Sequence, residues 1–160
     1  MKKSLVLSGI VFLAAACLLS LIIYTNTVDS WFTSDDYVII GQLVEKGYFY
    51  SWNEASGGYL RPMAVFSIMI DYQLWGFNPT GYHAFNLLLN VLCAFCVYVL
   101  AGDLFRVFFH YRGRNTAFFA GFLFLLLPSH AEPVVWISAM ADLLATFICY
   151  FVNHCLSKNA

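Results

Sequence analysis

A stretch near the beginning of the chain reads Leu5-Val-Leu-Ser-Gly-Ile-Val-Phe-Leu-Ala-Ala-Ala-Cys-Leu-Leu-Ser-Leu-Ile-Ile-Tyr24. It carries no charged side chain, and as a helix it extends about 30 Å, the thickness of the hydrocarbon core of a bilayer. The rest of the chain has the same character, since 61% of its 160 residues are hydrophobic and 11% are charged. A soluble domain has about 25% charged residues. The sequence therefore predicts an integral membrane protein, and without a basic stripe it predicts no nucleic-acid partner.

Three further apolar stretches are candidate spans, at 82–109, 116–130 and 134–156. Together with 5–24 they predict an all-α, polytopic fold of about four transmembrane helices, which form a single membrane domain over 1–160. The uninterrupted apolar part of the third stretch is short, at about 18 Å of helix. We therefore expect the residues up to His130 to complete that crossing.

The loop between the first two spans, about 25–81, is expected to contain two helices beside the membrane. Residues 35–46 begin with acidic residues and are followed by Gly47, as is typical of a short capped helix. Residues 62–75 are apolar but too short to span a bilayer. They begin with proline and are followed by Gly76, which predicts an interfacial helix.

Basic residues indicate the orientation of the chain. Most of them lie before the first span, between the second and third, or after the fourth: Lys2, Lys3, Arg106, Arg112, Arg114 and Lys158. Only Lys46 and Arg61 fall within 25–81, so the positive-inside rule predicts cytoplasmic termini and an outside loop at 25–81. The expected location is the plasma (inner) membrane, with the N-terminus in the cytoplasm.

The outside loop carries candidate reactive side chains. Asp35 and Asp36 are adjacent, and paired carboxylates can act as a general base or bind a hard divalent cation. The alternative is structural, because an Asp at a helix start caps free amides and favours the helix dipole. Arg61 has a fork of donors that matches a phosphate. Its alternative is a salt bridge to one of the outside carboxylates.

A second group of ionisable residues, His130, Glu132 and Asp142, lies in the most hydrophobic third of the chain. An ionisable group at membrane depth costs roughly 2.5–3.5 kcal/mol, so it persists mainly where it serves a site. The alternative is a turn at the membrane surface, marked by two prolines, in which these side chains are hydrated. In the expected topology, His130 and Glu132 lie on the same outside face as the loop at 25–81. Ionisable residues that are distant in the sequence therefore gather on one face, which favours one functional site.

Several motifs run through both regions: Asp35-Asp36-Tyr37, Leu60-Arg61-Pro62, Asp71-Tyr-Gln-Leu-Trp-Gly-Phe-Asn-Pro79, Gly81-Tyr-His-Ala-Phe-Asn-Leu-Leu-Leu-Asn90 and Pro128-Ser-His-Ala-Glu-Pro-Val-Val-Trp-Ile-Ser138, with Asp142. Together they resemble the N-terminal part of membrane glycosyltransferases of the GT-C superfamily. The most similar group is the protein O-mannosyltransferase relatives that often carry tetratricopeptide repeats. The resemblance covers nearly all of residues 1–156.

The resemblance implies an enzyme that transfers a sugar from a polyprenyl- or dolichyl-phosphate carrier to an acceptor hydroxyl, on a protein or glycan, at the extracytoplasmic face. Asp35 matches the proposed general base of the family and Asp36 its acidic neighbour, which makes both candidate catalytic residues. The candidate substrate- and phosphate-binding residues are Arg61, His130, Glu132 and Asp142. The cofactor stays open, with a divalent metal (Mg or Mn) on Asp35, Asp36 and Glu132 as one option.

Two other functions remain open from the sequence. One is a non-catalytic membrane assembly or scaffold protein, and the other is a flippase or transporter of lipid-linked sugars. A transporter places its ionisable residues at mid-bilayer in broken helices, whereas those of this chain gather at one face. Since the family continues through further spans after Leu156, we expect these 160 residues to insert into a membrane but to transfer no sugar alone.

Overall fold

The computed structural model describes residues 2–33, 35–47, 62–110 and 113–159, with side chains for all of these except 2–5, 130 and 153–159. Over the described residues the secondary structure is helical, without a strand. The elements are α1 (Lys2–Ile23), α2 (Thr25–Val28), α3 (Asp35–Lys46), α5 (Pro62–Trp75), α6 (Pro79–Phe109), α7 (Arg114–Leu126), η2 (Pro128–His130), α8 (Ala131–Val135), η3 (Ile137–Ala139) and α9 (Met140–Asn159).

The two helices expected in the 25–81 loop are present as α3 and α5. Each ends at the expected glycine, because Gly47 (φ 80°) and Gly76 (φ 58°) adopt the left-handed conformation that glycine reaches without steric cost. After Gly76, the Asn78 side chain accepts a hydrogen bond from the Thr80 amide at 3.2 Å and caps α6. Local sequence signals therefore set these boundaries.

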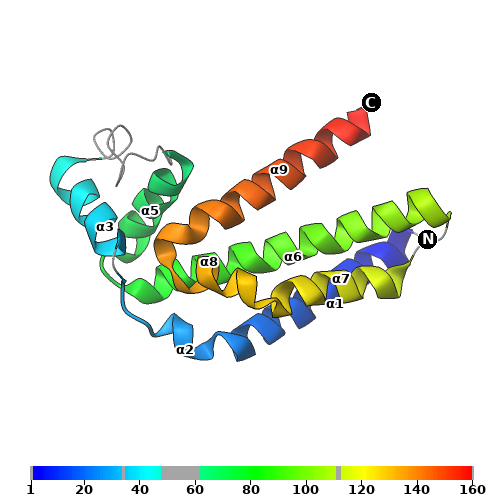
Figure 1. Ribbon diagram of the computed structural model, residues 1–160, viewed down its shortest axis with the longest axis horizontal. Coiled ribbons are helices and arrows are strands. Elements are labelled where there is room, and N and C mark those ends of the chain that lie inside the picture. Colours follow the sequence, from blue (N-terminus) through cyan, green and yellow to red (C-terminus); the bar gives the residue numbers. More distant parts are fainter. Residues whose placement is uncertain (1, 34, 48–61, 111–112, 160) are drawn as a thin grey trace.

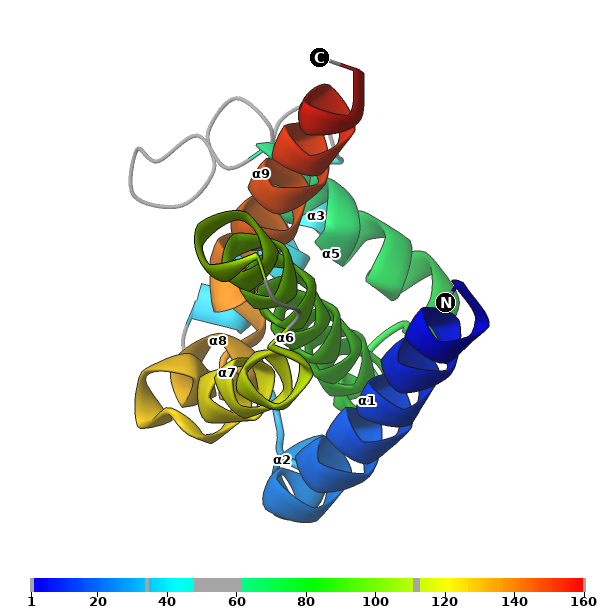
Figure 2. The ribbon, with the colours of Figure 1, turned by 90° about the vertical axis from the view of Figure 1, so that its right-hand side faces the viewer.

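Helix α6 lies at the centre of the bundle, with α1, α7 and α9 around it (Figure 2). Phe12 of α1 is fully buried and stacks on Tyr98 of α6, with ring centroids 4.6 Å apart. It also packs against Gly121 of α7, where an added Cβ would lie 2.5 Å from the Phe12 ring. Ser8 and Tyr98 share a buried hydrogen bond of 3.1 Å. Close aromatic packing thus holds α1, α6 and α7 together.

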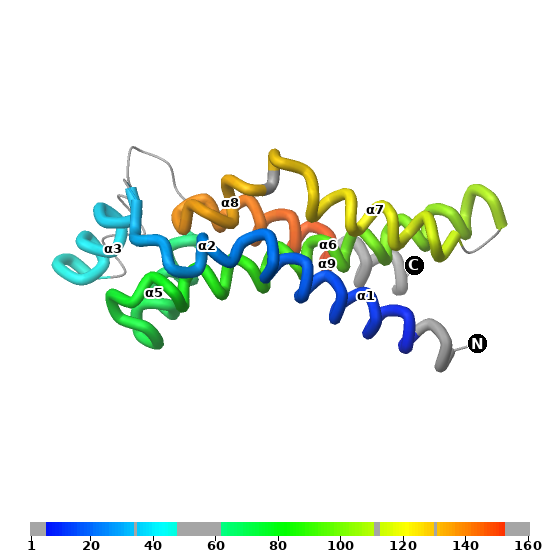
Figure 3. Tube along the Cα trace, turned by 90° about the horizontal axis from the view of Figure 1, so that it is seen from below, coloured from blue at the N-terminus to red at the C-terminus, as the bar shows by residue number. Residues whose placement is uncertain are grey.

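The helices run lengthwise, so that segments distant in sequence meet at the same end (Figure 1). Helices α3 and α5 lie at one end, and α2 and α8 lie in the same half of the molecule, which we call the loop end (Figures 1 and 3). The start of α1 and the end of α9 lie toward the other. The loop end therefore collects helices α2, α3 and α5 from the 25–81 segment and the turn between α7 and α9.

Two of the described helices are long and apolar enough to cross a membrane, Val6–Ile23 within α1 and Pro79–Phe109, which is α6. The later stretches form shorter apolar helices than expected, Arg114–Leu126 and Ile137–Val152. The hydropathy of the chain and these helices support a membrane protein.

The expected stretches at 116–130 and 134–156 are each interrupted. Helix α7 ends before Leu127, whose extended backbone (ψ 124°) is what a residue preceding a proline prefers. Trp136 is also extended (φ −95°, ψ 113°), which separates α8 from η3 and delays the start of α9 to Met140. The polar sequence around Pro128 to Ser138 is therefore a short, broken connection at the loop end.

Candidate functional site

The Asp36 carboxylate joins the start of α3 to η3. Its Oδ2 accepts hydrogen bonds from the Thr33 amide at 3.0 Å and the Thr33 hydroxyl at 3.3 Å. Its Oδ1 accepts from the Ser138 amide at 2.8 Å and the Ser138 hydroxyl at 2.5 Å. Only 1% of Asp36 is exposed. Because four donors surround the two oxygens, this carboxylate serves as a structural link.

An apolar cluster lies where the same elements meet. It joins residues from the segment before α3, from α3 itself, and from α5, α6, η3 and α9: Phe32, Ile40, Leu43, Ile68, Tyr82, Ile137 and Met140. The Phe32 and Tyr82 rings pack edge to face with centroids 5.2 Å apart. We call this set the junction cluster. It fixes the direction in which the first turn of α3 points.

Asp35 differs from its neighbour, because it is exposed while Asp36 is buried. Both belong to the first turn of α3, where the helix dipole favours a negative charge. From the sequence, the two carboxylates were both predicted to be catalytic residues. The structure separates them into an exposed group and a buried anchor that holds it in position.

The other acidic candidates also lie at the loop end. Glu132 is in the first turn of α8 and Asp142 in the first turn of α9, and both are exposed. Arg61 and the side chain of His130 fall outside the described residues. Within the described part of the chain, no three His, Cys, Asp or Glu side chains gather into a possible metal site. The option of a metal on Asp35, Asp36 and Glu132 thus lacks a donor cluster among the described residues.

Two buried polar side chains of α6 hold the loop end onto the bundle. His83 Nε2 lies 3.2 Å from the Ser30 carbonyl, ahead of α3. The Asn86 amide donates to the Pro133 carbonyl of α8 at 3.2 Å. His83 is 1% exposed and Asn86 is fully buried. These contacts fasten the segments that carry Asp35 and Glu132 to the same helix. They were not identified from the sequence, because nothing local indicates which backbone carbonyl a polar side chain will meet.

A second buried carboxylate, Asp71 of α5, was also missed as a site residue. It is 3% exposed, and its Oδ2 has no hydrogen-bond partner among the described residues. Burial raises the pKa of this carboxyl to about 7. Asp71 follows Ala64 and Ile68 at helical spacing on the buried face of α5. An acid in that apolar stripe is the signal that could have identified it.

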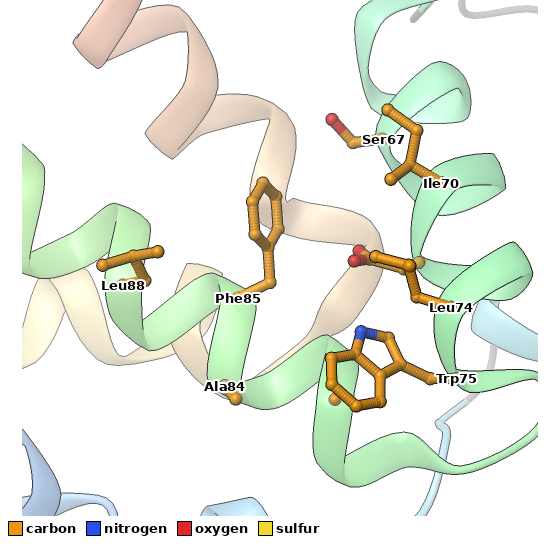
Figure 4. Close-up of a pocket in the computed structure, with 9 residues that line it drawn as sticks. Ser67, Ile70, Leu74, Trp75, Ala84, Phe85 and Leu88 are labelled. Carbon is orange, nitrogen blue, oxygen red and sulfur yellow. The ribbon is translucent and has the colours of Figure 1, made fainter.

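Asp71 lines a cavity of about 320 Å³ between α5 and the first turns of α6. Figure 4 shows Ile70, Leu74 and Trp75 on α5 facing Phe85 and Leu88 on α6. The lining is apolar apart from Asp71 and Ser67. None of its lining residues takes part in the Asp36 link, which connects α3 to η3.

The sequence of this chain is similar to those of several known proteins. Protein O-mannosyl-transferase Tmtc1 of Drosophila melanogaster is 28% identical over an alignment of 156 positions, and this alignment covers 89% of this chain. Protein O-mannosyl-transferase TMTC4 of Homo sapiens is 34% identical over 109 residues, and F38B6.6 of Caenorhabditis elegans is 33% identical over 86. This chain is similar in sequence to protein O-mannosyl-transferases. The resemblance to protein O-mannosyltransferase relatives expected from the motifs is confirmed.

The chain covers only part of these protein O-mannosyl-transferases. It spans 17% of the Drosophila protein, 14% of the human one and 12% of the nematode one. No family model matches the chain, and no solved structure matches it.

Proposed function

We propose that this chain contributes the acidic, extracytoplasmic end of a glycosyltransferase related to the protein O-mannosyl-transferases. The reaction is transfer of a sugar from a polyprenyl- or dolichyl-phosphate carrier to an acceptor hydroxyl outside the cytoplasm. The observation that carries the proposal is the contrast at the start of α3, where a buried Asp36 holds an exposed Asp35 on a fixed turn. The similarity in sequence to protein O-mannosyl-transferases supports the choice of chemistry.

In this mechanism Asp35 is the general base. Its carboxylate takes the proton of the acceptor hydroxyl while the hydroxyl oxygen attacks the anomeric carbon of the sugar. The bond between that carbon and the carrier phosphate breaks, and the phosphate leaves with the electron pair. Attack opposite the leaving phosphate inverts the anomeric centre. Inverting glycosidases likewise use a carboxylate as the general base.

The other candidates have supporting roles in the proposal. Arg61 and His130 supply positive charge or donors to the departing phosphate. Glu132 and Asp142, exposed at the starts of α8 and α9, orient those donors or contact the sugar. Asp36 is a positioning residue, since its oxygens are already bound by Thr33 and Ser138.

The test uses the complete reading frame that encodes this chain, expressed in membranes and supplied with polyprenyl-phosphate mannose and an acceptor peptide. Replacing Asp35 by Asn keeps the shape of the side chain but removes its basicity. We expect turnover to fall by about 10²–10⁴-fold, with donor binding retained. Asp29→Asn, also an exposed carboxylate ahead of α3, is the matched control and retains turnover.

Full activity of the Asp35→Asn protein would contradict the assignment of the base. Donor binding without turnover in the unaltered protein would instead favour a flippase or transporter. Neither binding nor turnover would favour a scaffold protein. A cytoplasmic N-terminus and an outside 25–81 loop are part of the proposal, because the donor phosphate must meet Asp35 on the outer face.

A further inference from the structure

The pocket between α5 and α6 plays no part in the transfer step proposed above. We propose that it binds the headgroup of a membrane aminophospholipid, with the Asp71 carboxylate as the partner of the lipid ammonium group. The inference depends on the described geometry of α5 and α6 and does not require that the protein transfers sugar.

The buried Asp71 carboxylate is the first feature that favours a cationic ligand. A buried polar atom without a hydrogen bond is costly, and a buried charge more so. Asp71 Oδ2 is such an atom within the described residues, and the walls around it offer mainly hydrocarbon. A ligand that brings N–H donors and a positive charge removes this cost. Pairing with an ammonium group also favours the ionised carboxyl, and so opposes the rise in pKa that burial causes.

The aromatic lining of the pocket also favours a cation. Trp75 and Phe85 approach the pocket from α5 and α6 respectively (Figure 4). The faces of aromatic rings attract cations, with indole the most effective. A carboxylate and two rings around one cavity form a set that suits an ammonium group better than a neutral hydroxyl.

The surface beside the pocket suits the acyl chains of a lipid. Helix α5 exposes large apolar side chains, and two of them, Ile70 (40% exposed) and Leu74 (67%), also line the pocket. Leu88, 51% exposed, continues the apolar lining along α6. The pocket therefore opens onto a surface suited to hydrocarbon. A phospholipid with a primary amine places its charge beside Asp71 and its acyl chains along this surface, whereas a small soluble amine lacks the second part.

Size and construction of the pocket agree with this occupant. A volume of about 320 Å³ is at the lower end of the range for ligand pockets, which suits a headgroup. The Trp75 ring can lie against the start of α6 only because residue 81 is glycine, since a Cβ there would be 2.2 Å from Trp75 Cγ. Glycine at residue 81 thus leaves the space that the Trp75 ring occupies.

The experiment measures lipid retention by native mass spectrometry, with the purified 160-residue chain in an amine-free detergent. Phosphatidylethanolamine and phosphatidylcholine with identical acyl chains are added in equal amounts. The choline headgroup carries the same charge but has no N–H donor. We expect the unaltered chain to retain phosphatidylethanolamine roughly tenfold better, as expected for one hydrogen bond to a charged group. Asp71→Asn should abolish the preference, while Asp29→Asn should keep it.

A second pair of variants tests the cavity itself. Ala84 is exposed and lines the pocket, so Ala84→Phe fills the space without removing the carboxylate. It should also abolish the preference, and Ala145→Phe at an exposed position of α9 should not. Equal retention of both lipids by the unaltered chain, or a preference that survives Asp71→Asn, would overturn the proposal. Displacement of the lipid by millimolar ethanolamine would overturn the choice of a lipid over a soluble amine.

Discussion

At the scale of single residues, two buried carboxylates show how surroundings decide the role of an acid. Asp36 has four hydrogen bonds from Thr33 and Ser138, so burial leaves it stabilised. Asp71 is equally buried, but one of its oxygens has no partner in the described structure. The first carboxylate organises the fold, and the second is a site that a ligand can complete.

The Asp36 link gives a prediction about stability. Asp36→Ala leaves the Thr33 and Ser138 donors unpaired, and should lower the free energy of unfolding by about 3 kcal/mol or more. Asp35→Ala, one position away and exposed, should cost no more than about 1 kcal/mol, the size of a helix-dipole contribution. Unfolding of each purified variant in mixed micelles, followed by circular dichroism, measures the difference. Equal losses would show that the buried link contributes little.

Asp71 gives a prediction about pH. Its pKa is about 7 in the folded chain and 3.8 in the unfolded one, so folding favours the protonated form. The stabilising effect is complete below about pH 4 and is lost as the pH rises through 7. Its upper limit is on the order of 4 kcal/mol. In amine-free detergent, the stability of the unaltered chain should fall between pH 5 and pH 8 relative to that of Asp71→Asn. Parallel pH profiles would contradict a raised pKa.

At the scale of secondary-structure elements, helix ends were predictable and long-range contacts were not. Gly47 and Gly76 ended α3 and α5 as expected, because the need for a positive φ is a property of one residue. The break at Trp136 was missed, since the apolar sequence on both sides of it looks continuous. The contact between Asp36 and Ser138 was also missed, because periodicity does not tell which turn a helix end will meet.

The same distinction applies to the candidate site. The sequence placed Asp35, Asp36, Glu132 and Asp142 in two acidic regions, and the structure brings those regions to one end of the bundle. It could not tell that Asp36 is buried and Asp35 exposed, because that difference depends on η3, about a hundred residues later. The proposed roles of Arg61 and His130 remain predictions.

The start of α6 provides a prediction at this scale. Gly81→Ala places a methyl group 2.2 Å from Trp75 Cγ, so the indole ring or the helix must move. We expect a loss of about 1–3 kcal/mol in unfolding free energy, as is typical of overpacking. Trp75 fluorescence, measured in a background without the other tryptophans, should shift as its surroundings change.

Gly41→Ala is the matched control for that experiment. Nothing lies within 4 Å of an added Cβ at this position of α3. The change should therefore be neutral or stabilise the chain by up to about 1 kcal/mol, because alanine favours a helix more than glycine does. If both variants behaved alike, the close approach of Trp75 to α6 would not be a constraint on residue 81.

At the scale of the whole molecule, the fold sorts its segments between two ends. Helices α2, α3 and α5 and the α7–α9 connection lie at the loop end, and the start of α1 and the end of α9 lie away from it (Figures 1 and 3). Six of the eight Lys and Arg residues flank the ends of spans predicted to face the cytoplasm. By the positive-inside rule, this distribution of charge predicts that the loop end faces away from the cytoplasm.

That orientation predicts a labelling pattern. In a background without cysteine, a cysteine at Glu45 of α3 should react with a membrane-impermeant thiol reagent in intact cells. One at Asn115, at the start of α7, should react only after the membrane is opened. Both positions are exposed, so access of the reagent is limited by the membrane alone. The reverse pattern would overturn the topology and place Asp35 in the cytoplasm.

The hydrogen bonds between Asp36 and Ser138 also determine when the first turn of α3 can be completed during synthesis of the chain. Ser138 lies 102 positions after Asp36 in the chain, which corresponds to roughly 5–20 s of translation at about 5–20 residues per second. During this interval Thr33 can already bind one oxygen of the carboxylate, while the other depends on water. The first acidic turn thus acquires its final support only when the segment that carries η3 has been made. Completion of the first turn of α3 is therefore timed by the arrival of η3, after the residues of α3 itself have been synthesised.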